Sequence, residues 1–518
     1  MATSATGTNS RQQKRSWRWR IVVLVLCMLP VGFVLFAYVV TRLAGQMRLE
    51  QAFAEADRLD PEWRFDDLEA QRLPCPEPDK NGIDQVRLVR KAMPPTQWPE
   101  WPFPKFDQDK AYLEQVRDAM NQSLEGDRLA PTLLNAEQER VVRAEVARAA
   151  TAIALARRMP DYPYGRYPLK WTKDFVSTLL PHVQEAREIA NLMKYDARLR
   201  ANDNDLESGF HDVKATLYAS RAVGDEELFI SQLVRIAVDF VAAQALERSL
   251  ACGRVSETTL LDLQKEFERE AQTPFFLTGA RGERAGLNYL LENVQEGKVT
   301  FGEYRRLMTG AAAGFAVLGT QAPNGIMLEM NTVRMYLNMR GERAQMLHYL
   351  NEIVELAKLP PWEALDAIEA KDTALGKNPP YWTFLLSVVN KICRADVRAK
   401  AVLRTAYTAL AMERFNLATG RWPDKVQDLV PLYLSEVPLD PFDGVPLRLI
   451  RKGHAIIVYS VGPDKEDNGG AVDLNPSVKG SDIGFVLQDQ VQRRQPGKPF
   501  EFPKRPTPAD NGSEVSKP

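Results

Sequence analysis

The sequence predicts a mainly α protein with an N-terminal transmembrane helix, a domain of stacked, repeat-like helical hairpins, and a small α+β module at the C-terminal end. Three observations predict this architecture: an uncharged apolar run over residues 21–40, helical periodicity over 107–394, and short β-branched segments after residue 440. The composition is that of an ordinary globular protein, with 45% hydrophobic and 26% charged residues. The net charge of −1 gives no indication of a nucleic-acid partner.

The first forty residues predict a single membrane anchor. The run IVVLVLCMLPVGFVLFAYVV, residues 21–40, carries no charge, and a helix of this length spans about 30 Å, the thickness of a bilayer core. A cleaved signal peptide is the alternative, but its apolar region is only about 7–15 residues long. The preceding segment is basic and holds no acid; its basic residues are Arg11, Lys14, Arg15, Arg18 and Arg20. The positive-inside rule therefore makes residues 1–20 the cytoplasmic tail of a single-pass protein of the cytoplasmic membrane, with the bulk after residue 41 extracytoplasmic.

Residues 41–106 predict a helical extension of the anchor, followed by a segment rich in proline and tryptophan. Prolines recur from Pro61 to Pro104 and exclude long helices there. The tryptophans of this segment have two interpretations: they form a ligand platform, or they pin an irregular segment onto the helical body. They are Trp63, Trp98 and Trp101.

Residues 107–394 predict an α-helical domain. The clearest helix runs from Asp225 to Cys252, with acids in its first turn and apolar residues around most of its surface, so we expect it to be largely buried. Gly253 is expected to cap this helix, and Ser256 to cap the next one over 258–271, which predicts a helical hairpin. Similar neighbouring segments predict a right-handed stack of hairpins, although no regular 34-residue period indicates a repeat family.

One short sequence occurs twice. Arg281-Gly-Glu-Arg-Ala285 returns as Arg340-Gly-Glu-Arg-Ala344, and both copies lead into apolar segments. The copies have two interpretations: a repeated Arg/Glu site on two related helices, or a chance or structural Glu–Arg pair at helix starts.

The sequence holds no recognised catalytic signature. The motifs HExxH, GxxxxGK[ST] and GxSxG do not occur. His348 and Glu352, four apart on a predicted helix, are a weak pair for a metal site. A loop that starts at Asp203 resembles an EF-hand, but Ser208 replaces its glycine and Lys214 its final glutamate. We therefore predict that the protein is not an enzyme.

Residues 395–487 predict a compact α+β module. A helix over 395–418 is followed by Gly420, and the segments PLRLI and AIIVY predict a β-hairpin around the three-residue turn 451–453. The remaining residues, 488–518, are rich in proline and polar side chains and predict a disordered tail.

Three motifs in this module resemble the globular domain of type II secretion major pseudopilins. After a long helix come Gly420-Arg-Trp-Pro423, then Asp440-Pro-Phe-Asp-Gly-Val-Pro446, then a strand that ends Tyr459-Ser-Val-Gly-Pro-Asp464. The module on an anchored helical body is also similar to a broad group of uncharacterised bacterial single-pass envelope proteins. Unlike in pseudopilins, the apolar run holds no acid and lies far before the matching helix, so we do not expect this chain to polymerise.

The resemblance implies a calcium site in the loop after the third motif, because pseudopilins bind calcium there through carboxylates and carbonyl oxygens. The implied ligands are Asp464, Asp467 and Asp473, with Asn468 and Asp482 as nearby oxygen donors. The aspartate spacing departs from the family pattern, and a solvated acidic turn is the alternative.

Together these features predict a membrane-anchored extracytoplasmic scaffold or interaction protein. Its partners would be the membrane, through residues 21–40, and an unidentified protein of the cell envelope. Two alternatives remain: an extracytoplasmic hydrolase with a site in the helical domain, and an accessory component of a secretion or pilus-like machine.

Overall fold

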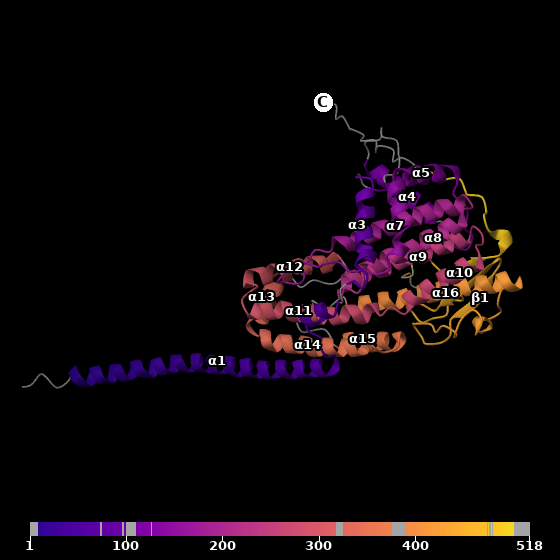
Figure 1. Ribbon diagram of the computed structural model, residues 1–518. Coiled ribbons are helices and arrows are strands. Elements are labelled where there is room, and N and C mark those ends of the chain that lie inside the picture. The colour runs from indigo at the N-terminus through magenta and orange to yellow at the C-terminus, as the bar shows by residue number, and fades with distance from the viewer. Residues whose placement is uncertain are drawn as a thin grey trace, which may run out of the picture.

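The protein is mainly α-helical, as the sequence predicts, with a three-stranded antiparallel sheet near its C-terminal end. A computed structural model describes residues 9–72, 75–95, 98–99, 110–125, 127–317, 325–374, 389–473, 475, 478 and 480–501. Helix α1 (Asn9–Leu59) runs along one side of the helical body and projects well beyond it (Figure 1). The body itself is built from bundled helices, with the sheet at the end remote from this projection (Figure 1).

The remaining helices follow in chain order. They are α2 (Phe65–Gln71), α3 (Gly82–Ala92), α4 (Lys110–Glu125), α5 (Ala136–Arg148), α6 (Ala150–Ala156), α7 (Pro181–Asn202), α8 (Leu206–Val223), α9 (Phe229–Leu250), α10 (Glu257–Ala271), α11 (Phe275–Gln295), α12 (Phe301–Val317), α13 (Gly325–Leu337), α14 (Met339–Leu356), α15 (Pro361–Ala374) and α16 (Val389–Thr419). Helices α7, α8 and α9 pack on one another, and α16 packs on α9, α10 and the sheet.

Helix α9 is a core helix, as its apolar surface predicts. Among the described residues it is also the helix that is long and apolar enough to cross a membrane, and 67% of its apolar window is buried inside the protein. It begins at Phe229, so the acids that precede it lie outside its first turn. The run predicted as the membrane anchor, residues 21–40, lies within α1, and its side chains are described only at residues 28, 29, 32, 33, 36 and 38–40.

The predicted hairpin of α9 and α10 is wrong in two details. Ser256 does cap α10, accepting a hydrogen bond from the Thr259 N–H at 3.3 Å, yet α10 packs mainly on α16. Gly253 is not a left-handed cap, because it is not among the residues with positive φ. A Cβ at Gly253 would lie 2.4 Å from Leu206 Cδ1, so a side chain there would have to displace the tip of this α8 leucine.

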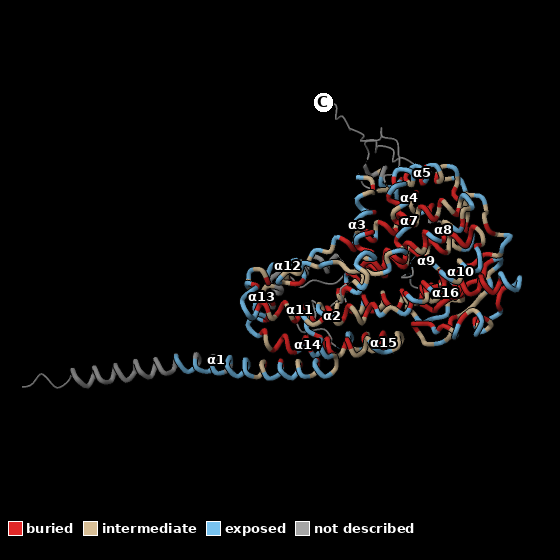
Figure 2. Tube along the Cα trace, viewed as in Figure 1, coloured by how far each residue is buried: buried red, intermediate tan, exposed pale blue. Residues whose placement is uncertain are grey.

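The C-terminal module shares its core with the helical body. One hydrophobic cluster joins α8 through Phe210, α9 through Leu246, α16 through Leu410 and the sheet through Ile456 and Phe485 (buried core in red, Figure 2). The boundary predicted between residues 394 and 395 falls inside α16. The helices and the sheet therefore stabilise each other through common apolar contacts.

The sheet has the order β1-β2-β3, with β1 Arg448–Lys452, β2 Ala455–Ser460 and β3 Ile483–Gln488. The predicted hairpin is confirmed, but its turn is Gly453-His454 rather than residues 451–453, and Gly453 has the positive φ (+59°) of a two-residue turn. Strand β3 was not predicted; it pairs with β2 through Ile457 opposite Val486.

The prediction of a disordered tail from residue 488 is wrong for residues 488–501. Arg493 is buried and pairs with the buried carboxylate of Glu413 on α16. The Arg494 guanidinium donates to the carbonyl oxygens of Ala201 and Asn202, both at 2.9 Å, at the C-terminal end of α7. These contacts give hydrogen bonds to carbonyl groups at the end of the helix. Residues 502–518 lie outside the described residues.

The C-terminal half of α1 is packed into the body. It runs parallel to α14: Gly45 lies beside Gly341, and Asn351 Nδ2 donates to the Ala52 carbonyl at 3.3 Å. Leu49, Ala52 and Ala56 are buried there. Trp63 is fully buried after the helix, which confirms its role in pinning this segment. Trp98 packs edge-on against Tyr195, whereas Trp101 lies outside the described residues.

The two RGERA copies have different surroundings. In α11, Arg281 donates to Asp60 at the end of α1 (2.9 and 3.0 Å), and Arg284 pairs with the same carboxylate. In α14, Arg343 instead donates to Asn288 and Gln295 on α11, at 2.7 and 2.6 Å. The copies therefore do not build one repeated site; each supplies a polar contact to a different neighbouring helix.

Because of Glu283, inside the first copy, we expect the free energy of unfolding to fall as the pH rises. Burial raises its pKa from 4.5 to about 7, although a hydrogen bond from the Phe229 N–H opposes the rise. Because the folded-state pKa lies above that of the unfolded chain, its contribution to stability is full below pH 4.5 and is lost as the pH passes 7. The Glu283→Gln variant should avoid this loss, on the order of 3 kcal/mol. Urea unfolding of both proteins at pH 4 and pH 8 measures it; parallel pH dependences would contradict the assignment.

Candidate functional site

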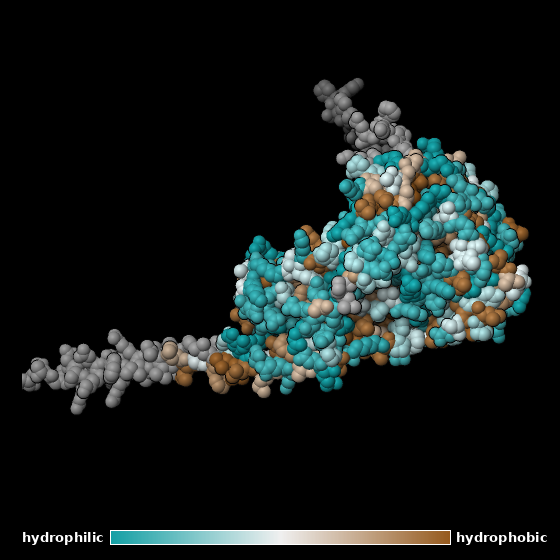
Figure 3. All heavy atoms as spheres, viewed as in Figure 1, coloured by the Kyte–Doolittle hydropathy of each residue, from teal (hydrophilic) through white to brown (hydrophobic). Residues whose placement is uncertain are grey.

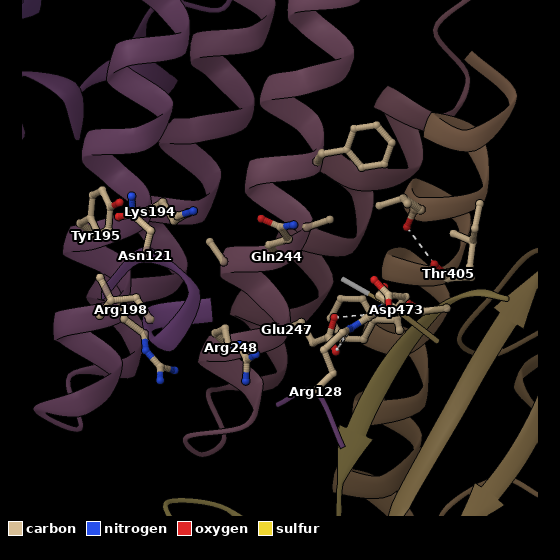
Figure 4. Close-up of a pocket in the computed structure, with 18 residues that line it drawn as sticks. Asn121, Arg128, Lys194, Tyr195, Arg198, Gln244, Glu247, Arg248, Thr405 and Asp473 are labelled. Carbon is tan, nitrogen blue, oxygen red and sulfur yellow. Dashed lines mark hydrogen bonds and ion pairs between the residues drawn. The ribbon is translucent and has the colours of Figure 1, made fainter. Parts of the chain in front are cut away.

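A cavity of about 300 Å³ lies between α4, α7, α9, α16 and β3, next to the shared core. Figure 4 shows Lys194 and Arg198 on α7, Gln244 and Arg248 on α9, and Thr405 on α16 around it. The helical period places each set on one face, since residues three or four apart share a face of a helix. The volume is at the lower end of the range for small-molecule sites.

Basic side chains outnumber acidic ones among the described residues that line this cavity. The basic residues are Arg128, Lys194, Arg198 and Arg248, and the acidic ones are Glu247 and Asp473. Glu247 is already neutralised: Arg128 donates to both of its carboxylate oxygens, at 3.0 and 2.7 Å (Figure 4). Arg128 also donates to the Asp473 carbonyl at 2.7 Å, which ties the loop before β3 to this wall. The remaining charge of the cavity is positive.

Arg198 is the least satisfied of these side chains. Its Nη2 donates to the Thr132 carbonyl at 2.7 Å. Its Nε and Nη1 are buried and have no hydrogen-bond partner within the described part of the chain. Burial lowers the pKa of Arg198, because the charged form loses its hydration. A buried guanidinium with two open donors destabilises the site by several kcal/mol unless an anion joins it.

Arg248 adds to the positive potential. Its Nη1 donates to the Asp127 carbonyl at 3.0 Å. Burial, and after it the charge of Arg198, lowers the pKa of Arg248 to about 10. The two guanidinium groups therefore repel each other, and a bound anion between them would relieve that repulsion. The geometry resembles the paired cations with which proteins hold carboxylates and phosphates.

The opposite wall of the cavity is apolar. Phe240 comes from the middle of α9, Val402 from α16, and Ile483 and Phe485 from β3. Apart from Arg128, which is paired with Glu247 and bonded to the Gly484 carbonyl of β3, the cations come from α7 and the C-terminal end of α9. Gln244 and Thr405 add neutral polar groups. A cavity with one cationic and one apolar wall can hold a molecule that carries an anionic head on a short apolar body.

Sequence reasoning missed this site, although one signal was present. Helix α9 was expected to be largely buried, and it carries Glu247 and Arg248. Charged residues on a buried helix need a partner or a ligand. Their partners, Arg128 for Glu247 and the Asp127 carbonyl for Arg248, lie in the segment that follows α4. Nothing in the local sequence of α9 indicates that this segment packs beside it.

The predicted calcium ligands have other partners in the structure. The Asp467 carboxylate accepts from Tyr459 Oη at 3.1 Å and lies 3.4 Å from Arg448 Nε. Arg448 also pairs with Asp440 and Asp443, at 3.1 and 2.6 Å, so its guanidinium supplies a positive charge to this cluster.

The other carboxylates of the loop bind backbone N–H groups. Asp464 accepts from Glu466 and Gly480, and Asp473 from Asn475. Asp482 accepts the N–H groups of Asn468, Gly470 and Ala471 at 2.7–3.2 Å. Within the described residues no three His, Cys, Asp or Glu side chains gather as metal ligands do. Calcium binding by Asp464, Asp467 and Asp473 stays a prediction.

Hydrogen bonds join the second C-terminal motif to the third, and the first motif to the end of β3. Asp440 of the second motif is fully buried and accepts from Ser460 Oγ at 2.7 Å and the Val461 N–H at 2.8 Å, both in the third. Trp422 of the first motif donates to Asp489 at 2.8 Å, just after β3. Burial raises the pKa of Asp440, against the hydrogen bonds it accepts. These residues hold the module together.

Two histidines lie in other acidic settings. His182 is fully buried, 2.6 Å from Glu226, which also accepts from Ser231 Oγ. His348 lies 3.3 Å from Glu352, the spacing noted in the sequence, but its other nitrogen lies 2.8 Å from Glu55 of α1. The His348 pair therefore joins α14 to α1.

Comparison with protein-family models, with curated proteins and with solved structures finds no significant match to this chain.

Proposed function

We propose that this chain is a single-pass, membrane-anchored extracytoplasmic protein that binds a small amphiphilic anion in the cavity between α7, α9 and β3. The proposal rests on Arg198, a buried guanidinium that lines a cavity whose other wall is mainly apolar and that has two nitrogens without a hydrogen-bond partner among the described residues. A carboxylate or phosphate head at Arg198 and Arg248 would supply the missing acceptors. The apolar body of the ligand would then lie against Phe240 and Phe485.

The residues that line the cavity favour a binding function over a hydrolytic one. The described lining holds no histidine or cysteine. Of its two carboxylates, Glu247 is bound to Arg128 and Asp473 accepts the Asn475 N–H. A hydrolase needs a nucleophile within reach of a base. The sequence predicts an interaction protein without naming what it binds; we propose a small amphiphilic anion as its ligand. A protein partner in the cell envelope is a further proposal.

The anchor is supported by the exposure of α1. Met28, Leu29, Phe33 and Phe36, the described large apolar side chains of residues 21–36, are each more than 60% exposed. A lipid bilayer would cover such a surface. The pseudopilin-like character of the C-terminal module is likewise a proposal, supported by the contacts of Asp440. Its shared core makes an independently assembling secretion subunit the less favoured alternative.

Isothermal titration of the full chain in lipid nanodiscs with hexanoate and hexyl phosphate tests the proposed ligand class. We expect saturable binding of both probes. The Arg198→Met variant, which keeps an unbranched side chain but removes the charge, should weaken binding about ten- to hundredfold, because charge-assisted hydrogen bonds contribute about 1.5–3 kcal/mol.

The matched control is Arg187→Met, which makes the same change at an exposed position of the same helix. Its affinity for hexanoate should equal that of the unchanged protein. Equal affinity in the Arg198→Met variant, with its helical circular dichroism intact, would show that the probe does not use this cavity.

A further inference from the structure

The body carries an apolar surface at the end from which α1 projects. Figure 1 places α12 and α13 at this end, and Figure 3 shows hydrophobic side chains where α1 leaves the body. On α13, the exposed apolar residues are Met330 (64%), Val333 (43%), Tyr336 (40%) and Leu337 (67%). Met330, Val333 and Leu337 have the i, i+3, i+7 spacing of one helix face, while Thr332 and Met335 are fully buried.

The C-terminal end of α13 lies beside the end of the apolar run of α1. A shallow hollow is lined by Tyr38, Thr41 and Arg42 of α1 together with Tyr336, Leu337 and Met339. Residue 40 is the last of the uncharged run, so these contacts place the exposed face of α13 at the level where the run ends.

The residue types at this level are those of a membrane interface. Tyr38 and Tyr336 are aromatic residues with a polar tip, which are enriched between headgroups and acyl chains. Arg42, Arg334 and Arg340 lie on the same segments, and arginine side chains reach toward lipid phosphates. The neighbouring acid, Glu329, lies 3.5 Å from Arg305. An apolar helix face flanked by arginines has the composition of an interfacial helix.

We infer that the exposed face of α13 rests on the lipid surface, so that the body is held against the membrane by a second contact beside the anchor. The occupant is the bilayer that holds residues 21–40; the inference thus rests on the proposed anchoring. Because α1 is fixed to α14 over its C-terminal half, the body would keep a fixed tilt with its anion cavity away from the bilayer.

Photo-crosslinking of the full chain in nanodiscs of phosphatidylcholine and phosphatidylglycerol tests this contact. The crosslinker p-benzoylphenylalanine is introduced separately at Leu337, at Phe36 within the proposed span, and at Leu432. Leu432 is the matched control, an 82% exposed leucine of the C-terminal module. We expect lipid adducts at Phe36 and Leu337, and at least about tenfold less adduct at Leu432.

The outcomes separate the two proposals. Adduct at Phe36 with none at Leu337 would leave the anchor in place and overturn the lipid contact of α13. Absence of adduct at both positions would overturn the anchor and, with it, this inference. Equal adduct at Leu337 and Leu432 would mean that lipid contacts the body without selecting α13, which also overturns it.

Discussion

The Arg493→Met variant is expected to unfold with a free energy about 3–5 kcal/mol lower than that of the unchanged chain. Arg493 is 3% and Glu413 1% exposed, and the two form an ion pair between the C-terminal segment and α16. Arg493 also donates to the carbonyl oxygens of Gln488 and Gly253, at 3.1 and 2.7 Å. Removing the guanidinium leaves the Glu413 carboxylate buried without its cation, and burial already raises the pKa of that carboxyl.

Urea unfolding in nanodiscs, followed by tryptophan fluorescence, measures the Arg493 effect. The control is Arg421→Met, which removes a solvent-exposed pair with Asp424 at 3.7 Å (62% and 91% exposed) and should change stability by less than about 1 kcal/mol. The double variant Arg493→Met, Glu413→Met should recover part of the loss, because it leaves no unpaired charge. A single variant as stable as the control would show that residues 488–501 are not anchored in the core.

The second large effect is expected at the junction of α1 with the body. Asp60 pairs with Arg281 and with Arg284, whose side chain is fully buried. Although burial opposes it, the hydrogen bond from Arg281 and the charge of Arg284 hold the pKa of Asp60 below its usual value. The Asp60→Asn variant removes the negative charge and leaves Arg284 buried with Asn351 Oδ1 at 3.4 Å. We expect a loss of about 3–5 kcal/mol.

Asp84→Asn is the matched control for Asp60→Asn. Asp84 pairs with Arg87 at 3.1 Å on the surface, where 59% and 46% of the two side chains are exposed, so its loss should cost less than about 1 kcal/mol. Limited proteolysis adds a local readout, because a loosened α1 should be cut near residues 60–72 before the body is. An Asp60→Asn protein with unchanged stability and cleavage would contradict a fixed connection between anchor and body.

The sequence predicted correctly those parts of the fold that depend on interactions between residues close together in the chain. The apolar surface of α9, the Ser256 cap and the hairpin of β1 and β2 depend on spacing within a few residues of one another. Gly253 shows the limit of such reasoning: a glycine after a helix suggests a cap, but here it admits Leu206 from another helix.

Features that depend on distant segments were not predicted. From the sequence, Arg493 was predicted to be part of a polar tail. Its partner, Glu413, is 80 residues away in the chain, so only the structure shows the pair. The cavity needs Arg198 of α7, Arg248 of α9 and Phe485 of β3 together, and no periodicity relates them. The three C-terminal motifs were recognised as a group, yet the hydrogen bond that Ser460 Oγ of the third motif donates to Asp440 of the second became visible only in three dimensions.

The proposed function depends on the charge of the cavity, and a comparison of two probes of equal length tests it most directly. Titration of the full chain with hexanoate and with hexylammonium keeps the apolar body constant and inverts the head. With Arg198 and Arg248 lining the cavity, hexanoate should bind at least about tenfold more tightly, a difference of about 1.4 kcal/mol. Equal or tighter binding of hexylammonium would contradict an anion site between α7 and α9.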